Sequence, residues 1–526
     1  MRAGEGGALN VGVPSPARRR RLGARTKLAY ASGSIEESMV TAAGVATMIY
    51  YNQVLGVSPA LCGAAFLIAS IVDAFADPLA GSLSDGVRTR WGRRHPFMLL
   101  AAAPLAICFY LLYQPPRGLG EHGLFLWFVL TMVGVRIAKT VYATPHSALG
   151  AELTDDYAER TSIFGWNWAV GAVSGVLLSV FVLFVIFPST PNFANGLLDR
   201  DRYRILAIVG AAVCFSVVMF CTLATADQIP FIHQRETMTA RGRYSAAARE
   251  TWRNVRSLAR NRSYLSVCLC WFILAISGGV ISVVGTYAML YAFHFTTEQI
   301  SLQSLVRLPG AIICVALSTY LTRLMDKKYT VILTIVLSCL LVGLPYSLRL
   351  LGWFPPNGTF ELLVAFYLIW TLGYIALPVV PIVIDSQLVD VADQHELRTG
   401  NRAEGLIFSI RLFAIKATQG LGGLIAGIGL ALMHFPKHAN AVNITPRITS
   451  GLLFMMGPLY YIIVFSGLGF ACMYNITRKS HEDMLVVLEA RRKAASTSSE
   501  AETPARAGPS MNSDVALNDQ PFPARP

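Results

Sequence analysis

An all-helical membrane protein, with twelve transmembrane helices in two six-helix pseudo-symmetric halves, is the fold class that the sequence predicts. Of the 526 residues, 54% are hydrophobic and 14% are charged, and the mean hydropathy is +0.50. Soluble domains carry about 25% charged residues, so the chain has more apolar sequence than a globular core uses. The apolar residues form long continuous runs, which indicate helices rather than the alternating strands of a membrane barrel.

Twelve apolar runs are long enough to cross the hydrocarbon core, which takes roughly 20 residues of helix. We therefore expect a basic N-terminus (1–27), a first half (28–226), a linker (227–262), a second half (263–475) and a largely disordered tail (476–526). The expected helices lie at 28–55, 59–84, 96–114, 123–148, 161–187, 203–226, 263–294, 299–325, 329–351, 360–384, 403–434 and 450–475.

Arginine and lysine gather on one set of alternating loops. They occur in the N-terminus, in the loop around Arg93, in the linker and in the tail. Cytoplasmic loops carry such an excess, so we predict an inner (plasma) membrane protein with both termini in the cytoplasm. The basic clusters are not interleaved with aromatic residues, so the net charge of +13 does not indicate a nucleic-acid partner. We expect a monomer whose partners are the lipid bilayer, a small-molecule substrate and a coupling cation.

The two halves repeat one another in their loops. Ser84-Asp85 precedes a basic loop after the second predicted helix, and Asp326-Lys327-Lys328 follows the eighth. Acidic residues likewise follow the fourth and the tenth helix. Parallel repeats of this kind place the substrate site of a transporter at the interface between the halves.

Two aspartates lie one turn apart in the second predicted helix. Asp73 and Asp77 are spaced i, i+4, which puts both carboxylates on one face. Ionisable groups at bilayer depth are costly and mark functional sites, and two neighbouring carboxylates repel unless a cation or a proton neutralises them. We interpret the pair as a site for a coupling Na⁺ or H⁺. The alternative is a structural ion pair with Lys139, Lys416 or an arginine.

The eleventh predicted helix carries two basic residues, Arg411 and Lys416. Small residues nearby permit close helix approach; these are Gly420, Gly422 and Gly423. Lys416 lies deeper, and we interpret it as the group that senses whether the aspartate site is occupied. The alternative is that it locks the fold.

The fourth predicted helix carries Arg136, Lys139 and Thr140, which share one stripe. Together with Arg307 in the eighth helix, they make the interior rich in cations, which favours an anionic group on the substrate. The alternative is that Arg136 or Arg307 lies near a membrane surface and extends its guanidinium into water.

Charges at predicted helix ends have other interpretations. We expect Asp85 to pair with Arg93 and Arg94 across a helix junction and to act as a gating latch. Glu36 and Glu37 either face the cavity or complement the dipole of the helix N-terminus, and position alone favours the second.

Several short motifs are distributed over residues 26–475. They are Thr26-Lys27-Leu28-Ala29-Tyr30, Asp73-Ala-Phe-Ala-Asp77-Pro78, Trp91-Gly92-Arg93-Arg94, Thr144-Pro145, Ala151-Glu152-Leu153-Thr154-Asp155-Asp156, and Arg402-Ala-Glu404-Gly405. Together they resemble the motifs of the glycoside-pentoside-hexuronide:cation symporter family of the major facilitator superfamily. The resemblance implies cation-coupled symport, with Asp73, Asp77 and Thr140 at the family's cation site and Lys416 at the position of its helix-eleven lysine.

The resemblance also identifies departures from the family. Ala143 and Trp168 stand where the family has a sugar-binding aspartate and arginine. Lys139 lies beside the cation-site threonine, where its ammonium would take the electrostatic role of Na⁺; this implies coupling to protons, or weak coupling.

We therefore predict a secondary active transporter that moves a glycoside or a related, anionic compound with Na⁺ or H⁺ by alternating access. Trp168, Arg136, Lys139 and Arg411 are expected to line the substrate cavity, and Lys416 to couple it to the cation. No catalytic motif and no cysteine spacing typical of a metal site occurs, so we expect neither an enzyme nor a cofactor. The alternatives are a symporter of lysophospholipids or other amphiphiles, and a non-transporting sensor with a transporter fold.

Overall fold

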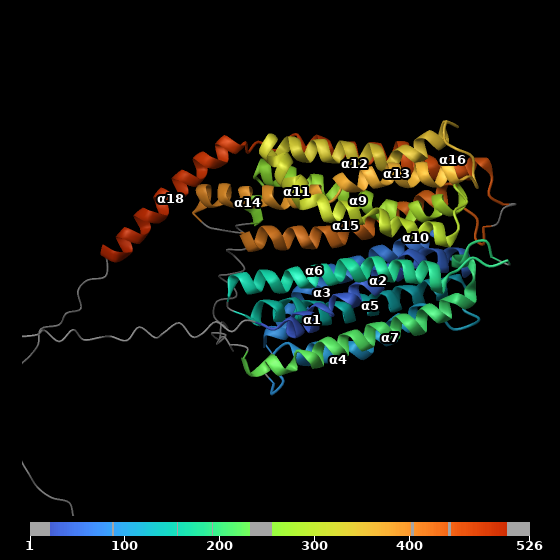
Figure 1. Cartoon of the computed structure of the whole chain (residues 1–526), viewed down its shortest axis with the longest axis horizontal. Helices are drawn as coiled ribbons and strands as arrows, with labels where there is room; N and C mark the ends of the chain where they lie inside the picture. Colours follow the sequence, from blue (N-terminus) through green and yellow to red (C-terminus); the bar gives the residue numbers. More distant parts are fainter. Residues whose placement is uncertain are drawn as a thin grey trace, which may run out of the picture.

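Two layers of long helices lie side by side in the computed structural model of the chain (Figure 1). One layer comes from the first half of the sequence and the other from the second half. The structure describes residues 22–86, 89–154, 156–191, 193–231, 255–400, 404–439 and 443–501. Apart from two isolated bridges, the regular structure in these ranges is helical.

The described part of the first half contains seven α-helices. A π-helical turn follows the second of them at Tyr50–Val54, and another follows the sixth at Phe181–Ile186. The helices are α1 (Ala24–Ala31), α2 (Ser34–Ile49), α3 (Pro59–Gly86), α4 (His95–Leu112), α5 (Glu121–Glu152), α6 (Tyr157–Val180) and α7 (Arg200–Ala224).

The second half divides three of its transmembrane segments into two helices each. Its helices are α9 (Arg262–Tyr291), α10 (Thr297–Val306), α11 (Leu308–Leu324), α12 (Lys327–Leu350), α13 (Phe360–Ala376), α14 (Val379–Thr399), α15 (Glu404–Leu432), α16 (Pro446–Phe454) and α17 (Tyr460–Ala471). A final helix, α18 (Arg478–Ala501), projects from one end of the bundle (Figure 1).

Eleven helical segments of the described chain are long and apolar enough to cross a membrane. The predicted first helix, 28–55, is not among them, and a turn at Ser32 and Gly33 separates α1 from α2. Even so, α2 packs against α6 and α7. The chain is therefore a multi-pass membrane protein, with the all-helical architecture that the sequence predicts.

The tenth transmembrane segment is longer than predicted. We expected it to end at 384, but α14 continues to Thr399, where Gly400 closes it with a φ of +72°. The prediction stopped where carboxylates begin. These carboxylates have cationic partners on other helices: Asp385 contacts Arg411, and Asp390 contacts Lys327. Such pairing lets a helix continue through charged positions.

The tail also differs from the prediction of a largely disordered segment. Met484 and Leu488 of α18 are buried, and the spacing i, i+4 puts them on one face of the helix, which packs against α14. Arg491 donates a hydrogen bond to the carbonyl oxygen of Leu397 at 2.8 Å. Residues 502–526 of the predicted tail, residues 1–21 of the basic N-terminus and residues 232–254 of the linker lie outside the described residues.

Helix α15 approaches α3 and α9 closely because glycines face each other at both contacts. Gly427 lies against Gly63 of α3, and Gly422 lies against Gly279 of α9. A Cβ atom added at Gly422 would meet the backbone of α9 at Ile276 and Gly279. These glycines let the central helices of the two halves sit backbone to backbone, as the sequence predicts for this part of the chain.

Hydrogen bonds join the halves at one end of the bundle. We call the end that carries Arg93 and Glu152 the basic end, and the other the opposite end. At the opposite end, Tyr291 Oη donates to Gln53 Oε1 at 3.1 Å, and the backbone N–H of Ala439 donates to the same oxygen at 2.7 Å. Further contacts between the halves in the same region include Tyr287 with Asn52, Ser189 with Glu298, and Asn195 with Thr297.

The glycine packing predicts a stability difference between two neighbouring sites. Gly422→Ala drives a methyl group into the backbone of α9, and overpacking of this kind costs about 1–3 kcal/mol. A lower melting temperature in detergent is the expected result. Gly278→Ala is the matched control, because its Cβ would meet no atom within 4 Å. Equal melting temperatures for the two variants would contradict this account of the packing.

Candidate functional site: a cavity and an ion cluster between the halves

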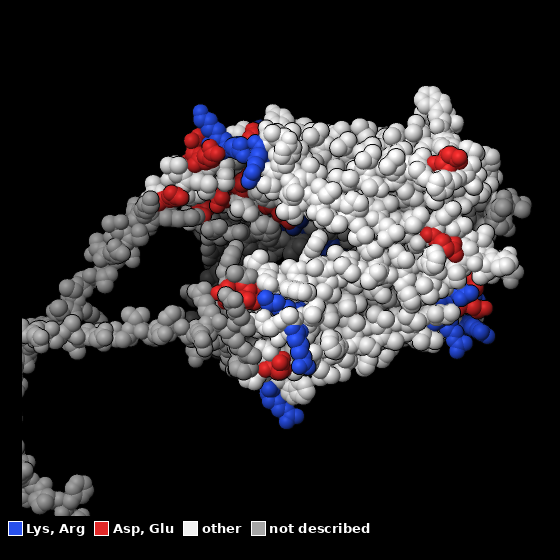
Figure 2. Space-filling view, in the orientation of Figure 1, with Lys and Arg blue, Asp and Glu red and all other residues white. Residues whose placement is uncertain are grey.

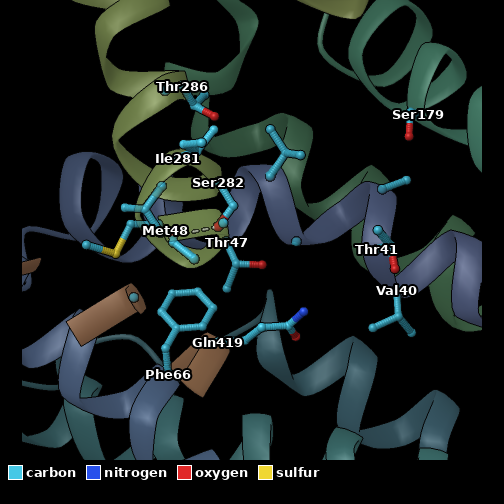
Figure 3. A pocket seen from close by; sticks show the side chains of 18 of the residues that line it. Val40, Thr41, Thr47, Met48, Phe66, Ser179, Ile281, Ser282, Thr286 and Gln419 are labelled. Atoms are coloured by element: carbon cyan, nitrogen blue, oxygen red, sulfur yellow. Dashed lines mark hydrogen bonds between the residues drawn. The ribbon is translucent and has the colours of Figure 1, made fainter. Parts of the chain in front are cut away.

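A cavity of about 470 Å³ lies between the two halves. Figure 3 shows Thr47 of α2, Phe66 of α3, Ser282 of α9 and Gln419 of α15 projecting into it. Four charged side chains also line it: Glu37, Arg136, Lys139 and Arg307. The lining therefore combines aromatic surface, hydroxyl and amide groups, and an excess of positive charge.

The molecule is hollowed between the halves toward the basic end. Figure 2 shows this hollow on the side from which α18 emerges. The opposite end is the one where Gln53 and its neighbours hold the halves together. This arrangement has the asymmetry that an alternating-access transporter needs, with one end joined and, among the described residues, the other open.

Asp73 and Asp77 share one hydroxyl partner. The Oγ1 atom of Thr140 lies 3.0 Å from Asp73 Oδ1 and 3.1 Å from Asp77 Oδ1. A threonine hydroxyl has a single proton to donate, so it can donate to only one of these carboxylates at a time. The other oxygen–oxygen contact then lacks a hydrogen, unless one of the carboxyl groups is protonated. A proton or a small cation bound among these three oxygens would remove that deficit.

Basic side chains from both halves neutralise the two aspartates. Lys416 Nζ lies 2.6 Å from Asp77 Oδ2 and 3.3 Å from Asp73 Oδ2, and Arg136 lies 3.5 Å from Asp73 Oδ2. The Asp73 side chain is 3% exposed, whereas that of Asp77 is 37% exposed. Two carboxylates thus meet two cations, so the formal charge of this cluster is zero.

The cluster follows from helix periodicity. Asp73 and Asp77 share one face of α3, and Arg136 and Thr140, also four residues apart, share one face of α5, which packs against α3. Lys416 comes from α15, which packs along α3 from the other half. Sequence spacing therefore determines each half of the cluster, and helix packing brings the two together.

The MFS/sugar transport protein family matches the chain over residues 29–478. The chain belongs to this family. The predicted membership in the glycoside-pentoside-hexuronide:cation symporter family is confirmed, and so is the major facilitator fold. As a member of a transporter family, the protein is not an enzyme.

Relatives and solved structures resemble this transporter over most of their length. The isoprimeverose transporter of Lactiplantibacillus pentosus is 25% identical over 75% of this chain and 78% of its own. The glucuronide carrier protein homolog of Escherichia coli is 24% identical over 90% and 97%. A bacterial homolog of the human lysosomal transporter Spinster has a similar fold, with a TM-score of 0.61 and 15% identity over 87% of this chain and 97% of that one.

Lys139 of the transporter has a different partner from the one that its position beside Thr140 suggested. Its ammonium pairs with Glu37 Oε2 rather than taking the place of a cation at the aspartates. Glu37 and Lys139 both line the cavity, whereas the Glu36 side chain is 1% exposed and points into the first half. Adjacent residues of a helix point about 100° apart, which separates the two glutamates.

Two predicted cavity residues do not line the cavity. Arg411 pairs with Asp385 at 2.7 Å, and its guanidinium lies 5.4 Å from the ring centre of Trp271, so it is held inside the second half. Trp168 is 62% exposed on α6 and is not among the lining residues. Sequence spacing gives the residues that share a helix face but not the direction in which that face points.

The predicted gating arginines have an acidic partner on α5. Arg94 Nη2 lies 2.8 Å and Arg93 Nη2 lies 3.0 Å from Glu152 Oε1. The Asp85 side chain lies outside the described residues. The second half has an equivalent pair, Lys327 with Asp390 at 2.7 Å. In each half, a basic residue at the start of the third transmembrane helix (α4 or α12) thus pairs with an acidic residue of the fourth transmembrane segment (α5 or α14). Parallel repeats are expected to share such a contact.

Sequence reasoning missed three residues of this region. Asp385 was missed because the predicted tenth helix ended before it. Gln53 was counted as part of the predicted first transmembrane helix, although the polar dipeptide Asn52-Gln53 at the end of that helix could have marked it. Glu152 was used only as part of a motif, although an acid at the end of a long helix needs a basic partner if it is half-buried.

Proposed function

We propose that the protein is a symporter that couples the movement of an anionic glycoside to Na⁺ or H⁺. The observation that carries this proposal is the cluster in which Lys416 of the second half neutralises Asp73 and Asp77 of the first half. Membership in the MFS/sugar transport protein family supports it, as does the likeness to an isoprimeverose transporter and a glucuronide carrier homolog.

The coupling cation competes with the ammonium of Lys416. Two carboxylate oxygens and the Thr140 hydroxyl form an oxygen-rich site, which hard cations and protons prefer. When a cation or a proton occupies this site, the aspartates no longer need Lys416 for neutralisation. The ammonium then leaves the pair, because a surplus positive charge in a low-dielectric interior is unfavourable.

This exchange acts on the contact between the halves. Asp73 and Asp77 belong to α3, and Lys416 belongs to α15, so the ion pair is an attraction across the interface. Cation binding weakens that attraction and permits the halves to rearrange. Alternating access follows if the joined end and the open end exchange roles. By the excess of basic residues, the open end faces the cytoplasm.

The solute site is the cavity, and Arg307 supplies its anion-binding group. Among the described residues, the other charged lining groups have partners of opposite charge: Lys139 pairs with Glu37, and Arg136 with Asp73. Arg307 has no ion pair in the described chain, and its guanidinium lies 5.2 Å from the ring centre of Tyr374. An exposed guanidinium in a cavity suits a carboxylate, which accepts two parallel hydrogen bonds from it. The surrounding hydroxyl and amide groups suit sugar hydroxyls.

Substitution of either aspartate tests the coupling. Asp73→Asn and Asp77→Asn in proteoliposomes should reduce the gradient-driven accumulation of methyl β-D-glucuronide to the equilibrium level, because the neutral amide cannot bind the driving cation. Accumulation is measured with an imposed Na⁺ gradient and, separately, with an imposed proton gradient. Asp201→Asn, in the first turn of α7, is the matched control and should accumulate the solute as the wild type does. Accumulation that survives in both aspartate variants would contradict the proposed cation site.

Removal of Arg307 tests the solute site independently. Arg307→Gln should raise the KM for methyl β-D-glucuronide roughly 10- to 100-fold, since a hydrogen bond to a charged group contributes about 1.5–3 kcal/mol. The KM for the neutral methyl β-D-glucoside should not change. Arg323→Gln, at the far end of α11, is the control. An equal effect on the two glycosides would show that Arg307 does not select for the anion.

A further inference from the structure

Glu36 is a buried carboxyl group that the proposed coupling mechanism does not use. It lies in the first turn of α2, where 1% of the residue is exposed. Its Oε1 atom is buried and has no hydrogen-bond partner among the described residues. Glu37, the next residue, instead extends to the cavity with a side chain that is 54% exposed. The first turn of α2 thus carries one exposed carboxyl group, that of Glu37, and one buried carboxyl group, that of Glu36.

The groups around Glu36 come from its own helix and from two neighbours. On α2 the charged neighbour is Glu37, and on α5 it is Lys139. Tyr142 of α5 and Cys214 of α7 are further ionisable groups near it. Helix α6 faces this part of α2 with small uncharged residues, Gly171 and Ser174, against Ser34 and Ser38.

The charges of these groups favour a neutral Glu36. The ammonium of Lys139 is held by Glu37, so the two cancel. A negative charge on Glu36 would then be uncompensated, and its buried Oε1 atom would accept no hydrogen bond from the described residues. Burying an unpaired charge costs so much that a carboxyl group normally takes up a proton instead.

We propose that Glu36 is a proton-binding site of this protein, separate from the cation site at Asp73 and Asp77, and that Lys139 controls it. While Lys139 pairs with Glu37, the proton stays on the carboxyl of Glu36. If the ammonium turns from Glu37 to Glu36, the proton leaves Glu36 for the cavity and a carboxylate remains behind. Lys139 thus determines whether Glu36 is protonated or ionised, whereas the exposed carboxylate of Glu37 stays ionised in both arrangements.

The position of Lys139 connects this site to transport. Lys139 and Glu37 line the cavity, and Arg136, one turn before Thr140, links the same face of α5 to Asp73. An anionic solute that draws Lys139 or Arg136 toward itself changes the charge next to Glu36. This consequence for transport rests on the proposed function, whereas the presence of the proton does not.

Infrared difference spectra of the purified protein in lipid test the proton site without any transport measurement. At neutral pH, the spectrum of wild type minus Glu36→Gln should contain the C=O stretch of one protonated carboxylic acid, and this band should shift in D₂O. Glutamine resembles a protonated glutamic acid in shape, so the variant should melt near the wild-type temperature. A difference spectrum that contains carboxylate bands instead would overturn the proposal.

Two further variants test the control by Lys139. Glu37→Gln leaves the ammonium without its partner, so Lys139 should turn to Glu36 and the carboxylic acid band should be replaced by carboxylate bands. Lys139→Gln should retain the carboxylic acid band. A band that is unaffected by Glu37→Gln would overturn the role of Lys139. Because these spectra require no solute, a failure here leaves the proposed function intact, and a failure of accumulation in the transport assay leaves the proton site intact.

Discussion

The attraction between one ammonium of α15 and two carboxylates of α3 joins the two halves of this transporter inside the bundle. Buried charges are stable only while each has a partner, because their loss of hydration is not repaid otherwise. The cluster of Asp73, Asp77, Arg136 and Lys416 satisfies this condition with two charges of each sign. An added cation or proton breaks the balance in a medium that screens charge poorly. In the proposed mechanism, the relation between the halves therefore depends on which cation neutralises the aspartates.

The same two helices carry the groups on the solute side. Ser70 lies one turn before Asp73 on α3, and Gln419 lies one turn after Lys416 on α15, and both line the cavity. The glycine contacts of α15 with α3 and α9 leave little room for these helices to deform, because packed interiors shift between discrete arrangements rather than bending continuously. In the proposed mechanism, a change at the ion cluster would reach the cavity over one helical turn.

Local signals allowed most of the helices and the aspartate pair to be predicted from sequence. The length of an apolar run defines a transmembrane helix, and an acid in such a run is conspicuous, as Asp73 is. Features that depend on contacts between distant helices were missed. Helix α14 continues beyond 384, where Arg411 neutralises Asp385. The orientation of Trp168 depends on the rotation of α6 about its axis. The helix in the predicted tail is stabilised by its packing against α14. These are long-range properties that no spacing along the chain encodes.

The most direct test of this account is an experimental structure of the transporter determined with a saturating coupling cation, compared with one determined without it. The account predicts that the Lys416 ammonium lies away from Asp73 and Asp77 when the cation is bound, with the cation or a protonated carboxyl beside the Thr140 hydroxyl. Lys416 clamped between the two aspartates in both structures would contradict the exchange on which the coupling mechanism depends.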